Sequence, residues 1–179
     1  MTTDERLFTV KPVLDAVRRE CGDSEFGYRM QALYAHVLLR LGGRVVVINA
    51  QGQPDVVADL SGTTMLVQVK SVFHGGPACG LQLSQRELDG IRPASEQEAG
   101  YLALLDCAVP VCWVVLDHDH SILQDLASVR IATLRAAKKE PLSEECTSEF
   151  ADLIIRNQAK LGNLTFGILR ARALRGRPL

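Results

Sequence analysis

The sequence predicts an α/β domain in which helices flank a central mixed β-sheet. Two amphipathic helical segments come first, three β-branched segments follow at short intervals, and a capped helix then leads into two further apolar strands. The 179 residues, 47% hydrophobic and 23% charged, suffice for one well-packed domain over 1–179. We expect the core order α-β-β-β-α-β over 25–118. Residues 119–179 should add a C-terminal extension of helices and a final strand.

The first two helices are predicted over 5–20 and from Ser24 to about Leu41. Apolar residues recur in both segments with the three-to-four-residue spacing of an amphipathic helix. Cys21-Gly22-Asp23-Ser24 separates the two helices, and Gly42-Gly43 ends the second, as glycine commonly does at a helix C-terminus.

Three strands are predicted next, joined by turns at Gln51-Gly52-Gln53-Pro54 and Ser61-Gly62. The short connections predict an antiparallel meander over 44–50, 55–60 and 63–72. After a glycine-rich loop over 74–80, Ser84 and Glu87 form a capping box for a helix to about Arg92. The remaining predicted elements are strands 101–107 and 111–118, helices 121–138 and 144–161, and a strand at 164–173.

Three polar residues interrupt the apolar meander. Because side chains alternate between the faces of a strand, Gln68 and Lys70 share one face of the third strand. Pairing through the turn at Ser61-Gly62 brings Asp55, at the start of the second strand, close to both. Burying an unpaired charge is costly, so we expect these groups to pair with each other, with water or with a metal ion.

The residue types suit the hydrolysis of a phosphodiester. Mg²⁺ prefers oxygen ligands, which Asp55, the Gln68 amide and the backbone carbonyl of Val69 can supply. Lys70 can stabilise the developing charge or activate the attacking water. The alternative is an Asp55–Lys70 ion pair at the rim of the sheet with no catalytic role.

The spacing of Pro54-Asp55 and Gln68-Val69-Lys70 resembles the PD-(D/E)XK superfamily of restriction-endonuclease-like nucleases. The pattern is closest to Mrr-like and Holliday-junction-resolvase-like members with a D…QxK motif. These proteins often place a glycine, a glutamate and a closing glycine in the first core helix, where Gly27, Gln31 and Gly42 stand here. The resemblance covers about 25–118 and adds Gln31, either as a metal ligand or as a residue that hydrogen-bonds a metal ligand and orients it.

The resemblance implies a Mg²⁺-dependent endodeoxyribonuclease, with Mn²⁺ as an acceptable substitute. DNA is the implied substrate, in restriction and defence or in repair and recombination. The implied partners are a second copy in a homodimer and a protein of such a system. Because Gln68 and Gln31 replace acids, one alternative is a catalytically inactive DNA-binding or assembly subunit. Another is an unrelated protein-interaction domain.

Further candidates lie around this motif. Ser71, His74, Gln82 and Ser84 are candidate substrate contacts, because hydroxyl, amide and imidazole groups near a helix N-terminus suit phosphate. The segment 116–121 contains two histidines and two aspartates, which we interpret as a polar loop and not as a metal site. The five cysteines show no zinc spacing, and the charged N-terminus and absence of long apolar runs predict no membrane contact and a cytoplasmic protein.

Overall fold

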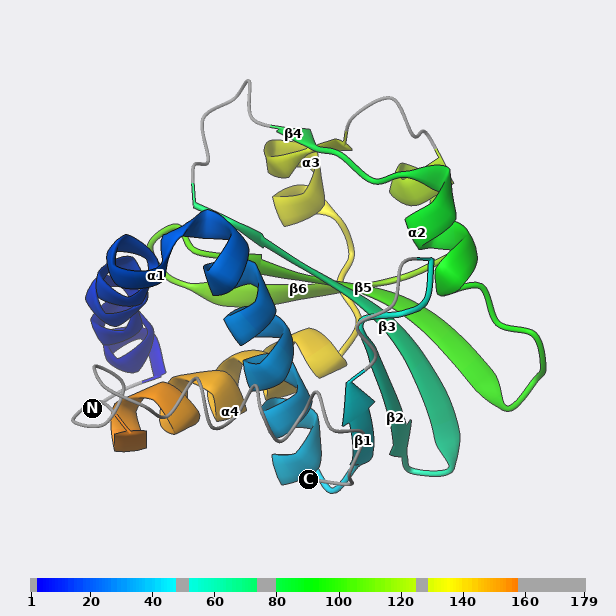
Figure 1. Cartoon of the computed structure of the whole chain (residues 1–179), viewed down its shortest axis with the longest axis horizontal. Helices are drawn as coiled ribbons and strands as arrows, with labels where there is room; N and C mark the ends of the chain where they lie inside the picture. The colour runs from blue at the N-terminus through cyan, green and yellow to red at the C-terminus, as the bar shows by residue number, and fades with distance from the viewer. Residues whose placement is uncertain (1–2, 48–51, 74–79, 125–128, 158–179) are drawn as a thin grey trace.

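A five-stranded mixed sheet lies at the centre of the molecule (Figure 1). The computed structural model describes residues 3–47, 52–73, 80–124 and 129–157. The spatial order is β1-β2-β3-β5-β6, with antiparallel pairing throughout except between β3 and β5, which are parallel. The predicted α/β class, the meander and the core element order are confirmed. The strands of this sheet are Arg44–Val47, Val56–Leu60, Thr63–Val72, Glu98–Asp106 and Cys112–Asp117.

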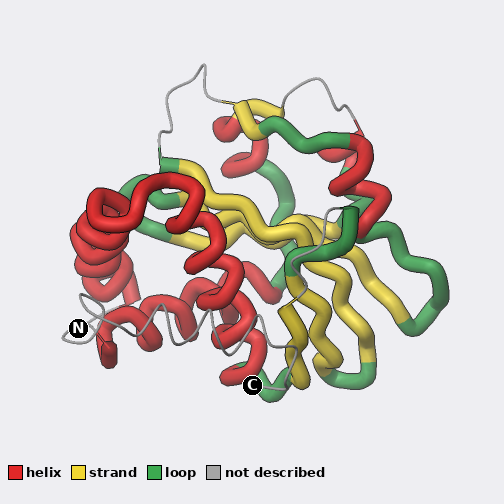
Figure 2. The backbone as a smooth tube through the Cα atoms, viewed as in Figure 1, coloured by secondary structure: helices red, strands yellow, loops and turns green. Residues whose placement is uncertain are grey.

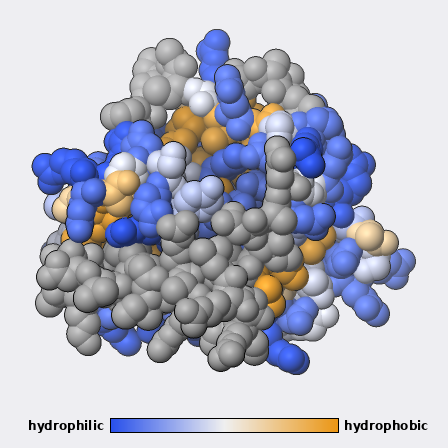
Figure 3. Space-filling view, viewed as in Figure 1, coloured by the Kyte–Doolittle hydropathy of each residue, from blue (hydrophilic) through white to orange (hydrophobic). Residues whose placement is uncertain are grey.

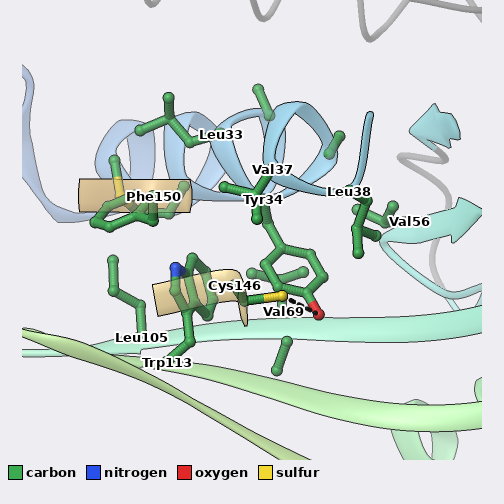
Figure 4. Packing of buried hydrophobic residues seen from close by; sticks show 14 of the residues in the cluster. Leu33, Tyr34, Val37, Leu38, Val56, Val69, Leu105, Trp113, Cys146 and Phe150 are labelled. Atoms are coloured by element: carbon green, nitrogen blue, oxygen red, sulfur yellow. Dashed lines mark hydrogen bonds between the residues drawn. The ribbon is translucent and has the colours of Figure 1, made fainter. Parts of the chain in front are cut away.

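Two long helices, α1 (Thr3–Arg40) and α4 (Leu142–Asn157), cover one face of the sheet. Gly22 interrupts α1 with a φ of 77°, which is the predicted break between two helices. Tyr34, Trp113 and Phe150 form the aromatic centre of this layer, with ring centroids 4.6 and 5.6 Å apart (Figure 4). All three side chains are fully buried, so the layer excludes water from the sheet.

A smaller layer covers the other face. It contains α2 (Gln85–Gly90), the 3₁₀ turn η1 (Ser121–Gln124), α3 (Ile131–Ala136) and a two-stranded sheet of β4 (Gly80–Leu81) and β7 (Val129–Arg130). Figure 2 shows this short sheet and its helices on the side away from α4. Its buried apolar side chains pack against Leu102, Leu104, Val114 and Leu116 of the central sheet.

The continuous helix predicted over 121–138 is wrong. Val129 pairs with Leu81, and Arg130 is extended, with a ψ of 136°, before α3 begins. Pairing with a distant strand therefore overrides the local helical pattern. Other boundaries moved by a few residues: β5 begins at Glu98, α2 ends at Gly90 and α4 begins at Leu142. The predicted strand 164–173, the end of helix 144–161 and residues 48–50 lie outside the described residues.

Side chains of α4 accept hydrogen bonds from backbone amides of the edge strand β6. The Trp113 N–H donates to Thr147 Oγ1 at 2.9 Å, and the Val115 N–H donates to Ser143 Oγ at 3.0 Å. These two side chains thus occupy amides that an open edge strand would leave unpaired. In the part of the chain that the structure describes, no helix is long and apolar enough to cross a membrane.

Candidate active site

Asp55 lies directly before β2 and faces the middle of β3. The register pairs Val56 with Val67, which puts Asp55 opposite Gln68. Asp55 Oδ2 accepts hydrogen bonds from Gln68 Nε2 at 2.5 Å and from the Val69 N–H at 2.8 Å. Gln31 of α1 also lines the groove beside Asp55 and favours the ionised form of its carboxylate. The structure thus brings together four of the predicted site residues, Asp55, Gln68, Val69 and Gln31, from three segments of the chain.

The Asp55 carboxylate is poorly solvated. Burial raises its pKa to about 6, although the Val69 N–H, the Lys70 charge and Gln31 each favour the ionised form. Glu87 adds a second negative charge nearby and acts in the same direction as burial. Asp55 is therefore an acid that a positive ligand would stabilise in its charged state.

Lys70 makes an ion pair with Glu87 of α2, and not with Asp55 as the rim ion-pair alternative required. Glu87 is also the capping-box residue: its Oε2 accepts from the Ser84 N–H at 2.8 Å and from Ser84 Oγ at 3.0 Å. Burial opposes ionisation of Glu87, but the hydrogen bonds from Lys70 and Ser84 outweigh it and lower its pKa. The cap of α2 thus holds the Lys70 ammonium in place.

Sequence reasoning identified Glu87 as a helix cap and missed its place in the site. The spacing of a capping box indicates that Glu87 bonds to Ser84. It does not indicate that the other carboxylate oxygen meets Lys70, because that contact depends on how α2 packs on β3.

The site residues line an open groove of about 570 Å³. Its walls come from α1, the Gly52–Asp55 turn, β3 and α2, and its lining residues are Gly27, Tyr28, Gln31, Gly52, Gln53, Asp55, Gln68, Val69, Lys70, Ser71 and Glu87. In Figure 3 hydrophilic side chains cover the region of α2 beside it. A polar, open groove of this kind suits a charged or polymeric ligand better than a small apolar one.

The predicted substrate contacts divide into three groups. Ser71 lines the groove. Gln82 and Ser84 are exposed and do not line it, and the Ser84 hydroxyl is occupied by the α2 cap. His74 lies outside the described residues.

Close backbone contact fixes α2 against the turn that carries Asp55. A Cβ added at Gly90 would lie 3.0 Å from the Gly52 carbonyl oxygen. Gly52 itself has a φ of 79°, and a Cβ there would lie 2.6 Å from Arg86 Nε. A side chain at either position would push α2 away from the turn that carries Asp55. Glycine at 52 and 90 therefore allows the two segments to pack in close contact.

A second group of potential metal ligands lies in the turn after β6. His118 Nε2 is 3.0 Å from Asp119 Oδ1, and His118 Nδ1 is 3.5 Å from Asp117 Oδ1. Asp117 Oδ1 also accepts the Asp119 N–H at 2.8 Å. All three residues lie in one turn, and they bring possible ligand atoms within 4.8 Å of one another.

The groove fits a hard divalent cation. Carboxylate, amide and carbonyl oxygens are the ligands that Mg²⁺ and Ca²⁺ take in proteins, and Asp55, Gln68, Gln31 and Val69 offer all three types. The poorly solvated Asp55 is the observation that supports this fit, because a cation would repay its desolvation. Gln68 now presents its nitrogen to Asp55, so its amide must turn to present oxygen to a shared cation.

No protein-family model matches the sequence, and a search of curated proteins finds no match. Among solved structures, the chain is similar to Hjc, a Holliday junction resolvase from the archaeal hyperthermophile Archaeoglobus fulgidus. The TM-score is 0.46 and the identity 16%, covering 61% of this chain and 90% of that chain. We therefore infer function from the geometry of the groove and not from this likeness.

Proposed function

We propose that this protein is a Mg²⁺-dependent DNA endonuclease of the restriction-endonuclease-like superfamily, with its active site in the groove around Asp55. The observation that carries the proposal is the convergence of the poorly solvated Asp55 with Gln68, the Val69 backbone and the nearby Lys70–Glu87 pair. Perturbed acids with specific charge partners in a groove are characteristic of catalytic sites.

The side chains divide the work of phosphodiester hydrolysis. Asp55 and Gln68, with the Val69 carbonyl, would hold the cation, and Gln31 would orient Asp55. When bound, Mg²⁺ supplies charge neutralisation at the phosphate and a more acidic water. Lys70 would stabilise the negative charge that develops on the phosphate, or position the water.

Glu87 is a positioning residue in this scheme. Its contact with Lys70 fixes the ammonium at the groove wall, and its contacts with Ser84 tie that position to α2. A lysine has four rotatable side-chain bonds, so a partner that restricts it lowers the entropic cost of reaching the transition state.

The test is cleavage of supercoiled, linear and branched DNA with Mg²⁺ or Mn²⁺. Wild type should cut at least one of these substrates, and Asp55→Ala and Lys70→Ala should abolish cutting while retaining the wild-type circular dichroism spectrum. Cleavage that persists in both variants would refute the assignment of the site.

A second function is favoured by one observation. Gln68 donates a hydrogen bond to Asp55, and the charge of Lys70 is paired with that of Glu87. These contacts suit a nuclease-fold subunit that binds DNA or a partner without cutting. Wild type that binds DNA with high affinity and cuts none of the substrates under either metal would establish this function in place of the first.

A further inference from the structure

Arg86 lies on α2 at the rim of the groove, next to the paired Glu87. Its Nε is 2.6 Å from where a Cβ of Gly52 would stand, so the guanidinium group lies over the Gly52 backbone. Gly52 lines the groove three residues before Asp55. The missing side chain at Gly52 is what lets Arg86 occupy this place.

The charge of Arg86 is not neutralised by the residues that the structure describes. None of their carboxylates forms an ion pair with it, although acids are close by in the sequence. Glu87 is engaged by Lys70 and Ser84, and Asp89 accepts hydrogen bonds from Gln85 and Arg92. The groove therefore has an exposed, uncompensated guanidinium at one rim.

This arrangement distinguishes Arg86 from its neighbour Arg92. Arg92, just beyond the same helix, is 3.3 Å from Asp89 and has a side chain that is 65% exposed. Neither arginine is among the residues that line the groove, but Arg86 contacts Gly52, which does line it. Two exposed arginines thus stand six residues apart, one paired and one available to an anion.

We propose that Arg86 binds a backbone phosphate next to the scissile one, so that the groove takes an internal phosphodiester of a nucleic-acid strand. This proposal rests on the proposed function. Guanidinium groups recognise phosphate oxygens through paired N–H donors. A duplex carries a charge about every 3.4 Å along each strand, so a phosphate at Asp55 and Lys70 brings others close to the rim. A ligand with a single phosphate would leave Arg86 without an anion.

The test is equilibrium binding of a fluorescent DNA duplex in chelator, at KCl concentrations from about 50 to 200 mM. Chelator prevents cleavage, so binding is read independently of catalysis. Arg86→Ala should weaken binding about three- to tenfold at every sequence tested and reduce the salt slope by about one. Arg86→Lys should recover part of the affinity. Arg92→Ala, the matched control, should bind within about twofold of wild type.

The outcomes separate this proposal from the proposed function. Wild-type binding with an unchanged slope in Arg86→Ala would overturn the role of Arg86 and leave the nuclease proposal standing. An equal loss in Arg92→Ala would show a general charge effect and would also overturn it. Absence of DNA binding by wild type, both in chelator and with Ca²⁺ in place of Mg²⁺, would overturn both. Circular dichroism of Arg86→Ala and Arg86→Lys checks that substitution at this exposed position leaves the fold intact.

Discussion

Two groups of side chains could bind a cation, one around Asp55 and one around His118, and the fold assembles them in different ways. Around Asp55, the neighbouring side chains come from α1, β3 and α2, and the carboxylate is poorly solvated. Around His118, the partners are its two sequence neighbours in one turn, and Asp119 is exposed. A cation at Asp55 would relieve a desolvated charge, whereas one at the turn would meet a carboxylate of Asp119 that is already exposed to solvent. Convergence from distant segments, and not residue type, therefore indicates the site.

The largest expected effect is on the rate of cleavage. Lys70→Ala should lower the single-turnover rate by about 10³-fold, because it removes a charge aimed at the transition state. His118→Ala should leave the rate within about twofold, since its turn has no part in the proposed chemistry. Similar losses in the two variants would break the distinction between the clusters.

Replacing the partner of Lys70 should have a smaller effect. Glu87→Gln keeps the size of the side chain and the contact with Ser84, but loses the charge that restrains the ammonium. We expect about a tenfold fall in kcat with little change in KM, and a shifted pH–rate profile. Asp119→Asn is the matched control. A wild-type kcat and pH profile in Glu87→Gln would contradict the positioning role.

Gln68→Glu should strengthen cation binding at Asp55, whereas the substitutions above weaken catalysis there. A second carboxylate beside Asp55 should tighten Mn²⁺ binding by about tenfold, measured by calorimetry. The substitution should also lower the stability of the cation-free protein, since the introduced carboxylate, when ionised, has no proton to donate to Asp55 and repels its charge. Unchanged affinity would place the cation elsewhere.

The smallest effect concerns stability and pH. Because burial raises the Asp55 pKa to about 6, the folded chain keeps a proton that the unfolded chain releases near pH 4. The free energy of unfolding should therefore fall as pH rises through this window. Asp55→Asn should flatten that fall by about 1 kcal/mol, because partial exposure screens the charge. Equal urea denaturation profiles from pH 4 to 7 for both proteins would count against the desolvation of Asp55.

Much of the fold followed from local pattern. Strand alternation and the short turn at Ser61-Gly62 were enough to predict the meander, and with it the contact between Asp55 and Gln68. The capping box predicted the start of α2 for the same reason: its contacts join residues close in sequence.

The features that escaped prediction depend on packing between distant segments. Val129 joins a strand because Leu81 lies beside it, and Glu87 reaches Lys70 because glycines let α2 approach the Asp55 turn. No periodicity encodes such contacts. The role of the site residues in catalysis stays a prediction for the variants above.

The most direct test is a crystal soaked in Mn²⁺, with the ion located by anomalous scattering. The predicted result is a peak between Asp55 and the Val69 carbonyl, with the Gln68 amide turned to present its oxygen. A peak at Asp117–His118–Asp119 with none at Asp55 would contradict the assignment of the groove as the cation site.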